Sequence, residues 1–150
     1  MTMKTVLEDS QLFRLLDEHD RAILADMAIR RTYAEGEQVF GEHEQAYGIC
    51  ILLEGRIALQ LDLGGNRRLT IGTVDPGEMF AWSGLVPPFT FTSAARALTA
   101  CEIAVLPSED LRRTFDDNPP VGYRVMQQVS ELVSLRLRDV QLQLVGLFGA

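Results

Sequence analysis

A series of short apolar runs separated by glycine turns fills the middle of the chain, and this pattern limits the possible folds more than any other feature. Between residues 29 and 78 the runs are rich in Ile, Val, Leu, Tyr and Thr. The turns between them contain Gly36, Gly41, Gly55, Gly64–Gly65 and Pro76–Gly77. Short strands with turn signals at such regular spacing predict an all-β sandwich or barrel.

Particular runs predict where the strands lie. The run 49–53 (ICILL) is continuously apolar, which indicates a strand buried on both faces. Residues 56–63 and 67–74 alternate in polarity around Gly-Gly-Asn and predict a hairpin. Two further strands follow at 92–98 and 101–107. The predicted core side chains of this region are Ile49, Ile51, Leu53, Leu59, Ile71, Val74, Ile103 and Val105.

Helical patterns flank the strands. Residues 10–28 have apolar side chains at near-helical spacing, with Asp20 as the predicted N-cap. Ser108 is the predicted cap of a helix after the last strand, and Pro119 and Pro120 suit the first positions of a long final helix. The prediction is one domain with N-terminal helices (1–28), a β region (29–107) and C-terminal helices (108–150).

The final helix carries a heptad-like apolar stripe. It consists of Met126, Val133, Leu137, Val140, Leu144 and Leu147, and it is widened by Val125, Val129 and Leu132. One small barrel does not cover so wide a stripe, so we expect the helix to pair with that of a second copy. The alternative is that the helix folds back on its own barrel. Residues 140–145 also alternate with period two, which leaves their helical state open.

Composition excludes several classes of partner and compartment. The net charge of −7 argues against a nucleic-acid surface. No run approaches the roughly 18 apolar residues of a membrane span, and the N-terminus lacks the apolar centre of a signal peptide. Cys50 and Cys101 lie in apolar strand-like runs, so we expect buried free thiols, as is typical of a cytoplasmic protein.

Catalytic and metal-binding patterns are weak. The chain has two histidines, and His43 with Glu42 and Glu44 makes too small a set for the metal site of a barrel enzyme. Ser83 lacks the Gly-x-Ser-x-Gly frame of a hydrolase nucleophile. We therefore expect no enzymatic activity, no metal and no cofactor.

Residues 79–98 form a long irregular segment that contains a single charged residue, Arg96. Long irregular connections in small domains are often binding loops. The segment follows Pro76–Phe80 (PGEMF) and precedes Ala100–Glu102 (ACE). Upstream, glycine, apolar and aromatic residues recur at a distinctive spacing. They are Gly36, Val39, Phe40, Tyr47, Ile49, Leu52, Gly55 and Ile57.

On these residues the whole chain resembles the cyclic-nucleotide-binding domain of the catabolite activator and FNR-type regulators. The resemblance implies a mainly β fold, a β-jelly roll (double-stranded β-helix) with short flanking helices and a long C-terminal helix. It also implies a homodimer through that helix. It stops before the point where such regulators continue into a helix-turn-helix, so no DNA-binding domain is expected within residues 1–150.

The family's phosphate-binding cassette falls on residues 80–93 without a gap. Phe80, Leu85, Val86 and Thr92 agree with it. The resemblance implies a ribose-binding glutamate at position 82 and a phosphate-binding arginine at position 91, but this chain has Trp82 and Phe91 there. In the acidic turn at residues 41–45 (GEHEQ), His43 replaces a glycine of the family. The candidate ligand-binding residues are Ala81, Trp82, Ser83, Gly84, Phe91 and Thr92.

Two interpretations follow from this altered cassette. In the first, the chain is a regulatory module that binds cyclic AMP, cyclic GMP or a flatter, less charged molecule, and signals through an unidentified effector protein. Loss of both charged contacts costs roughly 4 kcal/mol, or about three decades of affinity. Arg96 is a poor substitute for them, because its side chain leaves the strand on the opposite face from Phe91. In the second interpretation, the rings of Trp82 and Phe91 have filled the pocket, and the chain is a ligand-free structural or dimerisation module.

Overall fold

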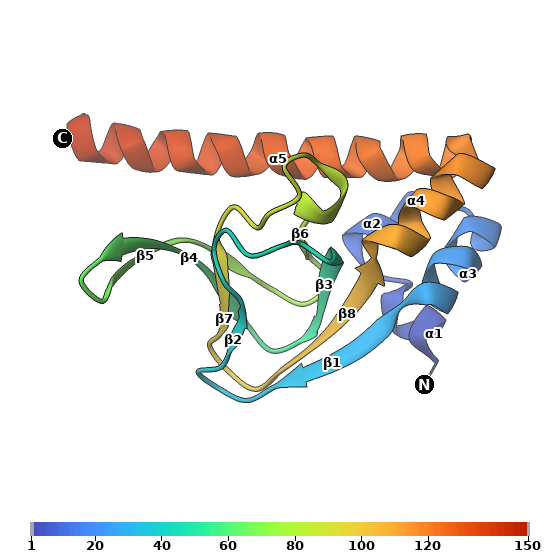
Figure 1. Cartoon of the computed structure of the whole chain (residues 1–150), viewed down its shortest axis with the longest axis horizontal. Coiled ribbons are helices and arrows are strands. Elements are labelled where there is room, and N and C mark those ends of the chain that lie inside the picture. Colours follow the sequence, from blue (N-terminus) through green and yellow to red (C-terminus); the bar gives the residue numbers. More distant parts are fainter. Residues whose placement is uncertain (1, 150) are drawn as a thin grey trace.

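A computed structural model describes residues 2–149, in which eight strands form two four-stranded antiparallel sheets (Figure 1). One sheet has the order β1-β8-β3-β6, and the other has the order β2-β7-β4-β5. This is the predicted β-jelly roll. The strands are β1 (Ile29–Tyr33), β2 (Gln38–Phe40), β3 (Gly48–Glu54), β4 (Ile57–Gly64), β5 (Arg67–Val74), β6 (Met79–Ala81), β7 (Ala94–Ala97) and β8 (Cys101–Pro107).

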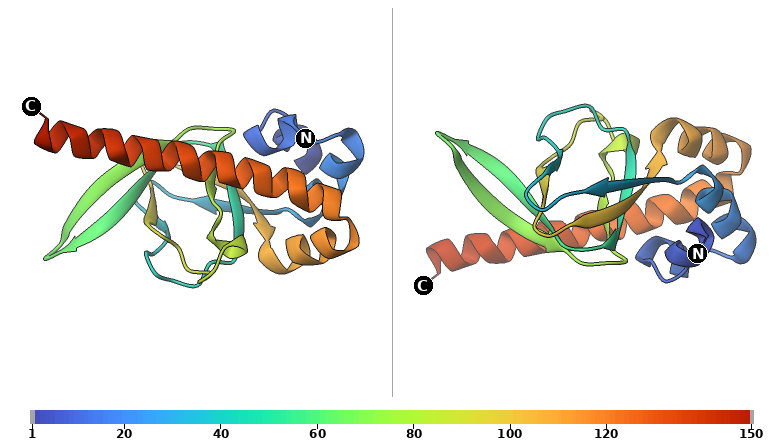
Figure 2. Two further views of the ribbon diagram at one scale, coloured as in Figure 1. Left: turned by 90° about the horizontal axis from the view of Figure 1, so that it is seen from above. Right: turned by 90° about the horizontal axis from the view of Figure 1, so that it is seen from below.

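Helices gather at one end of the roll and along one side of it. They are α1 (Met3–Leu7), α2 (Gln11–Arg14), α3 (Glu18–Met27), the 3₁₀ turn η1 (Ser83–Leu85), α4 (Ser108–Asp117) and α5 (Pro119–Phe148). Figures 1 and 2 show α5 running the length of the molecule, past the roll and beside the β4–β5 hairpin. Pro119 and Pro120 occupy its first turn as predicted, and residues 140–145 are helical.

The predicted cap of the N-terminal helix is wrong. The segment forms two helices, and Asp17 is the N-cap of α3, where its Oδ1 accepts a hydrogen bond of 2.8 Å from the Asp20 backbone N–H. Asp20 lies inside the helix instead. Its buried carboxylate forms an ion pair with Arg124 of α5, which joins the N-terminal helices to the first turns of α5.

The predicted cap at Ser108 is also wrong. Pro107 is the N-cap residue of α4, and no side chain caps this helix. Ser108 is the first residue of the helix, and its buried Oγ has no hydrogen-bond partner. The hydroxyl points instead at the backbone of Gly84, where it occupies the space that a side chain at Gly84 would need.

Strand β3 separates two apolar cores, which explains why its run is apolar throughout. Cys50 and Leu52 belong to the core between the sheets, whereas Ile49 and Ile51 belong to the core between the first sheet and the helices. Six of the eight predicted core residues are buried, but Leu53 and Ile71 are only half-buried. Leu53 packs at the edge of the helical core, and Ile71 lies on the edge strand β5. Cys50 and Cys101 are buried free thiols.

The two halves of α5 differ in what covers them. Val121, Val125 and Val129 are buried against the domain itself, and Met126 is half-buried beside them. Beyond Leu132, which is half-buried, the apolar residues are exposed, among them Val133 (38%), Leu137 (58%), Val140 and Leu144. The first half therefore folds back on its own domain, and the exposed apolar side chains of the second half have no cover within residues 2–149. No helix in this part of the chain is both long and apolar enough to cross a bilayer.

Candidate functional site

The loop between β6 and β7 is tied to the turn at residues 43–46. The Phe91 N–H donates to the carbonyl of Glu44, and the His43 N–H donates to the carbonyl of Phe91, both at 2.9 Å. Ala46 makes a third bond of 2.9 Å to the carbonyl of Phe89. These bonds hold the end of the loop in a strand-like path, which sends the Phe91 side chain into the roll.

Phe91 is a core residue. Its side chain is 2% exposed, and its ring stacks on that of Phe40 with a centroid separation of 3.7 Å and an angle of 7°. Tyr47 meets its edge at 5.2 Å, and Phe80 lies parallel to Phe40 at 6.1 Å. The position at which the resemblance implies a phosphate-binding arginine is therefore occupied by an aromatic stack.

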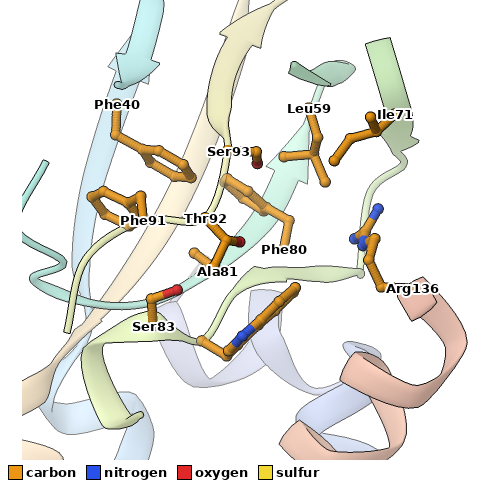
Figure 3. A pocket seen from close by; sticks show the side chains of 11 residues that line it. Phe40, Leu59, Ile71, Phe80, Ala81, Ser83, Phe91, Thr92, Ser93 and Arg136 are labelled. Carbon is orange, nitrogen blue, oxygen red and sulfur yellow. The ribbon is translucent and has the colours of Figure 1, made fainter. Parts of the chain in front are cut away.

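A cavity of about 60 Å³ lies beside this stack. Five of the six candidate residues line it: Ala81, Trp82, Ser83, Phe91 and Thr92. Figure 3 shows Phe80, Leu59 and Ile71 around the same space, together with the hydroxyls of Ser83, Thr92 and Ser93. The loop thus brings most of the predicted residues to one pocket, which is small beside the roughly 300–1,000 Å³ of typical ligand pockets.

Gly84 is the candidate that does not line the pocket. Its backbone packs on Gly48, where a Cβ would approach the Gly48 nitrogen at 2.9 Å. Its carbonyl accepts a hydrogen bond of 2.6 Å from Arg112 of α4. Glycine is required here for close contact between η1 and β3, so its part in the pocket is to position the turn.

Trp82 and Phe91 differ in their burial and in the core that each side chain packs against. Trp82 is half-buried and packs against the helical core as well as lining the pocket. Phe91 belongs to the core between the sheets. The two rings therefore contact different parts of the protein, and the pocket lies where these parts meet beneath α5.

One charged pocket residue escaped the sequence analysis. Arg136 of α5 reaches toward Ile71, across the pocket from Phe40 and Phe91 (Figure 3). Its Nε is buried without a hydrogen-bond partner. Residues 125, 129, 132 and 136 form one helical face toward the domain, and Arg136 is the charged member of this otherwise apolar series. That interruption is the signal that could have identified it.

The environment of Arg136 makes its charge available to a ligand. Within residues 2–149 its guanidinium forms no ion pair. Burial lowers the pKa of the guanidinium, and the nearby carboxylates of Asp139 and Glu78 oppose this effect. An arginine remains charged at neutral pH even so, and the site therefore contains a partly desolvated cation beside aromatic walls.

The other polar residues of interest lie elsewhere. Arg96 donates to the carbonyl of Gly36 at 2.8 Å and to Gln38, outside the pocket, as its position in the strand predicts. His43 is exposed and has a left-handed φ of 70°, which suits the glycine it replaces. Asp17, His19 and Asp20 cluster near α3, but Asp17 caps the helix and Asp20 pairs with Arg124.

Comparison with known proteins places this fold and pocket in one family. The family model described as the cyclic nucleotide-binding domain matches residues 30–118. The chain belongs to the cyclic nucleotide-binding domain family, and the resemblance seen in the sequence is confirmed.

Three relatives illustrate the match. The cyclic AMP receptor protein of Thermus thermophilus is 25% identical over 139 residues. A candidate cyclic nucleotide-binding protein from Geobacter metallireducens GS-15 has a TM-score of 0.80 and 26% identity, with 91% of this chain and 99% of that chain covered. The c-di-GMP responsive regulator CLP of Xanthomonas campestris has a TM-score of 0.72 at 22% identity, with 83% of this chain and 61% of that chain covered, which shows a shared fold.

This chain matches only part of its relatives' length, which limits what they show about its partners. The match covers 92% of this chain but 62% of the Thermus protein's length. The Thermus relative is by name a cyclic AMP receptor protein, which agrees with the predicted class of a ligand-sensing module. The prediction that nucleic acid is not a partner rests on charge alone, and the relatives lend it no support.

Proposed function

We propose that this chain is a ligand-sensing regulatory domain in which a small molecule binds beneath α5 and α5 passes the change to a partner. The observation that carries the proposal is the double role of α5. Arg136 on one side of the helix lines the pocket, and the exposed stripe on another side has no cover within residues 2–149. A ligand that moves Arg136 moves the partner-binding surface as well.

The partner proposed for the stripe is a second copy of the chain. Met126, Val133, Leu137, Val140 and Leu144 repeat at heptad-like spacing, which is the pattern of a helix pair. Burial of a Val or Leu side chain contributes about 1.5–3 kcal/mol, so several such residues supply a substantial driving force. The buried free thiols suit the reducing cytoplasm, where we place the protein.

Cyclic AMP and cyclic GMP are expected to bind weakly. The cavity of about 60 Å³ has room for roughly two water molecules, and Trp82 offers no carboxylate to ribose hydroxyls. Phe91 also withholds the deep guanidinium that would neutralise a cyclic phosphate. The closed aromatic stack favours the alternative of a ligand-free dimerisation module, whereas the unpaired Arg136 favours a retained ligand.

Thermal denaturation with cyclic AMP or cyclic GMP at millimolar concentration tests the proposal, together with mass spectrometry of molecules released from the purified protein by denaturation. A bound small molecule must raise the melting temperature by linkage. Ser93→Val is the test variant for the pocket, because Ser93 lines it. The methyl groups of valine should fill part of the cavity and abolish the ligand-induced rise in melting temperature. If no molecule is released and neither these nucleotides nor any other small molecule tested stabilises the wild type, the chain is a ligand-free module and the proposal is wrong.

A further inference from the structure

The chemistry of the pocket lining narrows the class of ligand. Arg136 provides a planar guanidinium whose Nε is buried without a partner. A half-buried cation that forms no ion pair carries a desolvation cost, which an anionic ligand reduces. A guanidinium matches the planar fork of a carboxylate in a bidentate arrangement. The cation therefore favours a ligand with a single carboxylate at this edge of the pocket.

The opposite wall favours a flat body. The rings of Phe40 and Phe91 are parallel to within 7°, and those of Phe40 and Phe80 to within 11°. Trp82 adds an indole to the lining. Aromatic surfaces bind a flat π system through offset or edge contacts, whereas a puckered aliphatic ring of similar size makes fewer such contacts.

The volume of the pocket limits the size of the ligand. The cavity holds about 60 Å³, and a cavity of about 150 Å³ is known to admit benzene. The difference can be met by the side chains at the edge of the pocket, because both Arg136 and Trp82 are only half-buried. A nucleotide would require a much larger opening, including displacement of the fully buried Phe91 from its stack with Phe40.

We propose that the ligand of this pocket is a small planar carboxylate of about the size of benzoate, with its carboxylate on Arg136 and its ring against the wall of Phe40, Phe80 and Phe91. The inference rests on the proposed sensing function and names its ligand class. The hydroxyls of Ser83, Thr92 and Ser93 lie in the same lining, with Ser83 at the Phe91 end of the pocket, away from Arg136.

Four probes test the class by isothermal titration calorimetry on the full chain. Benzoate has the proposed shape and charge, benzamide has the shape without the charge, and cyclohexanecarboxylate has the charge without the flat ring. Cyclic AMP is the fourth probe. We expect benzoate to bind about 10- to 100-fold more tightly than benzamide, which is the effect of a hydrogen-bonded charge. Cyclohexanecarboxylate should bind more weakly than benzoate.

Arg136→Gln should reduce benzoate affinity to that of benzamide. Arg138→Gln is the matched control, because Arg138 is an exposed arginine on the same helix and its loss should leave the preference unchanged. Without ligand, Arg136→Gln should melt close to the wild-type temperature, since it removes a half-buried charge whose desolvation is opposed only by the nearby carboxylates of Asp139 and Glu78. That result also shows that any loss of binding is not a loss of folding.

The outcomes separate the ligand class from the function. If cyclic AMP binds and benzoate does not, the ligand class is wrong and the sensing function stands. If benzoate binds equally well to Arg136→Gln, the assigned carboxylate position is wrong. If none of the four probes binds and denaturation of the purified protein releases no small molecule, both the inference and the sensing function are wrong.

Discussion

At the scale of single residues, Phe91 has a packing role at the position where the resemblance implies a phosphate-binding arginine. Its ring is buried between Phe40 and Tyr47, so we expect Phe91→Ala to lower the free energy of unfolding by about 3–5 kcal/mol. Urea denaturation measures this loss. The control is Phe89→Ala, because the Phe89 ring is partly exposed and contacts Arg112. It should cost about 1 kcal/mol or less. Equal losses for the two variants would contradict the core role of Phe91.

His43 is a second residue that differs from the family pattern, and histidine in place of glycine is expected to lower the free energy of unfolding. Its φ of 70° is left-handed, which costs a residue with a Cβ about 1–2 kcal/mol. His43→Gly removes that cost but adds unfolded-state entropy worth about 0.4–1 kcal/mol. The net expectation is a gain in stability of about 0.5–1 kcal/mol, seen as a higher melting temperature. His43→Ala keeps the Cβ and should show no such gain. A lower melting temperature for His43→Gly would show that this turn does not resist the side chain.

At the scale of elements, α5 has two apolar sides that can be tested separately. Val133→Glu with Leu137→Glu places charges on the heptad-like stripe, and we expect it to produce a folded monomer in sedimentation equilibrium. Leu135→Glu with Leu142→Glu is the matched control. Two residues turn a helix by about 200°, so Leu135 lies opposite Val133, although it too is exposed to solvent. Dimers of the first variant, or a monomeric wild type, would contradict the proposed interface.

At the scale of the whole molecule, the sequence predicted those features that depend on local periodicity. The apolar run at 49–53 predicted a doubly buried strand, and the two cores on either side of β3 confirm it. The stripe and Pro119–Pro120 predicted α5. The features that it did not predict depend on contacts distant in sequence. Asp20 was mistaken for a cap because its partner, Arg124, is 104 residues away.

The candidate site was also predicted only in part, because the sequence located residues of one continuous loop but not the contacts made from distant parts of the chain. The cassette alignment located five pocket residues, because the loop is continuous in sequence. Gly84 does not line the pocket because its place is set by contact with Gly48, and Arg136 was missed because α5 crosses the pocket from the far end of the chain. No pattern within residues 79–93 could show which helix covers that loop.

The proposed sensing function makes a quantitative prediction about the whole molecule. If α5 couples the pocket to the dimer, benzoate must strengthen dimerisation by the same factor by which dimerisation strengthens benzoate binding, because linkage is reciprocal. Arg136 lies between Val133 and Leu137 on one rigid helix, so we expect a coupling of about 5- to 150-fold. Sedimentation equilibrium with and without benzoate gives the first factor. Calorimetry of the wild type and of the Val133→Glu, Leu137→Glu monomer gives the second. Equal factors above one support transmission through α5, whereas a dimer constant that benzoate leaves unchanged means that the pocket and the stripe act independently.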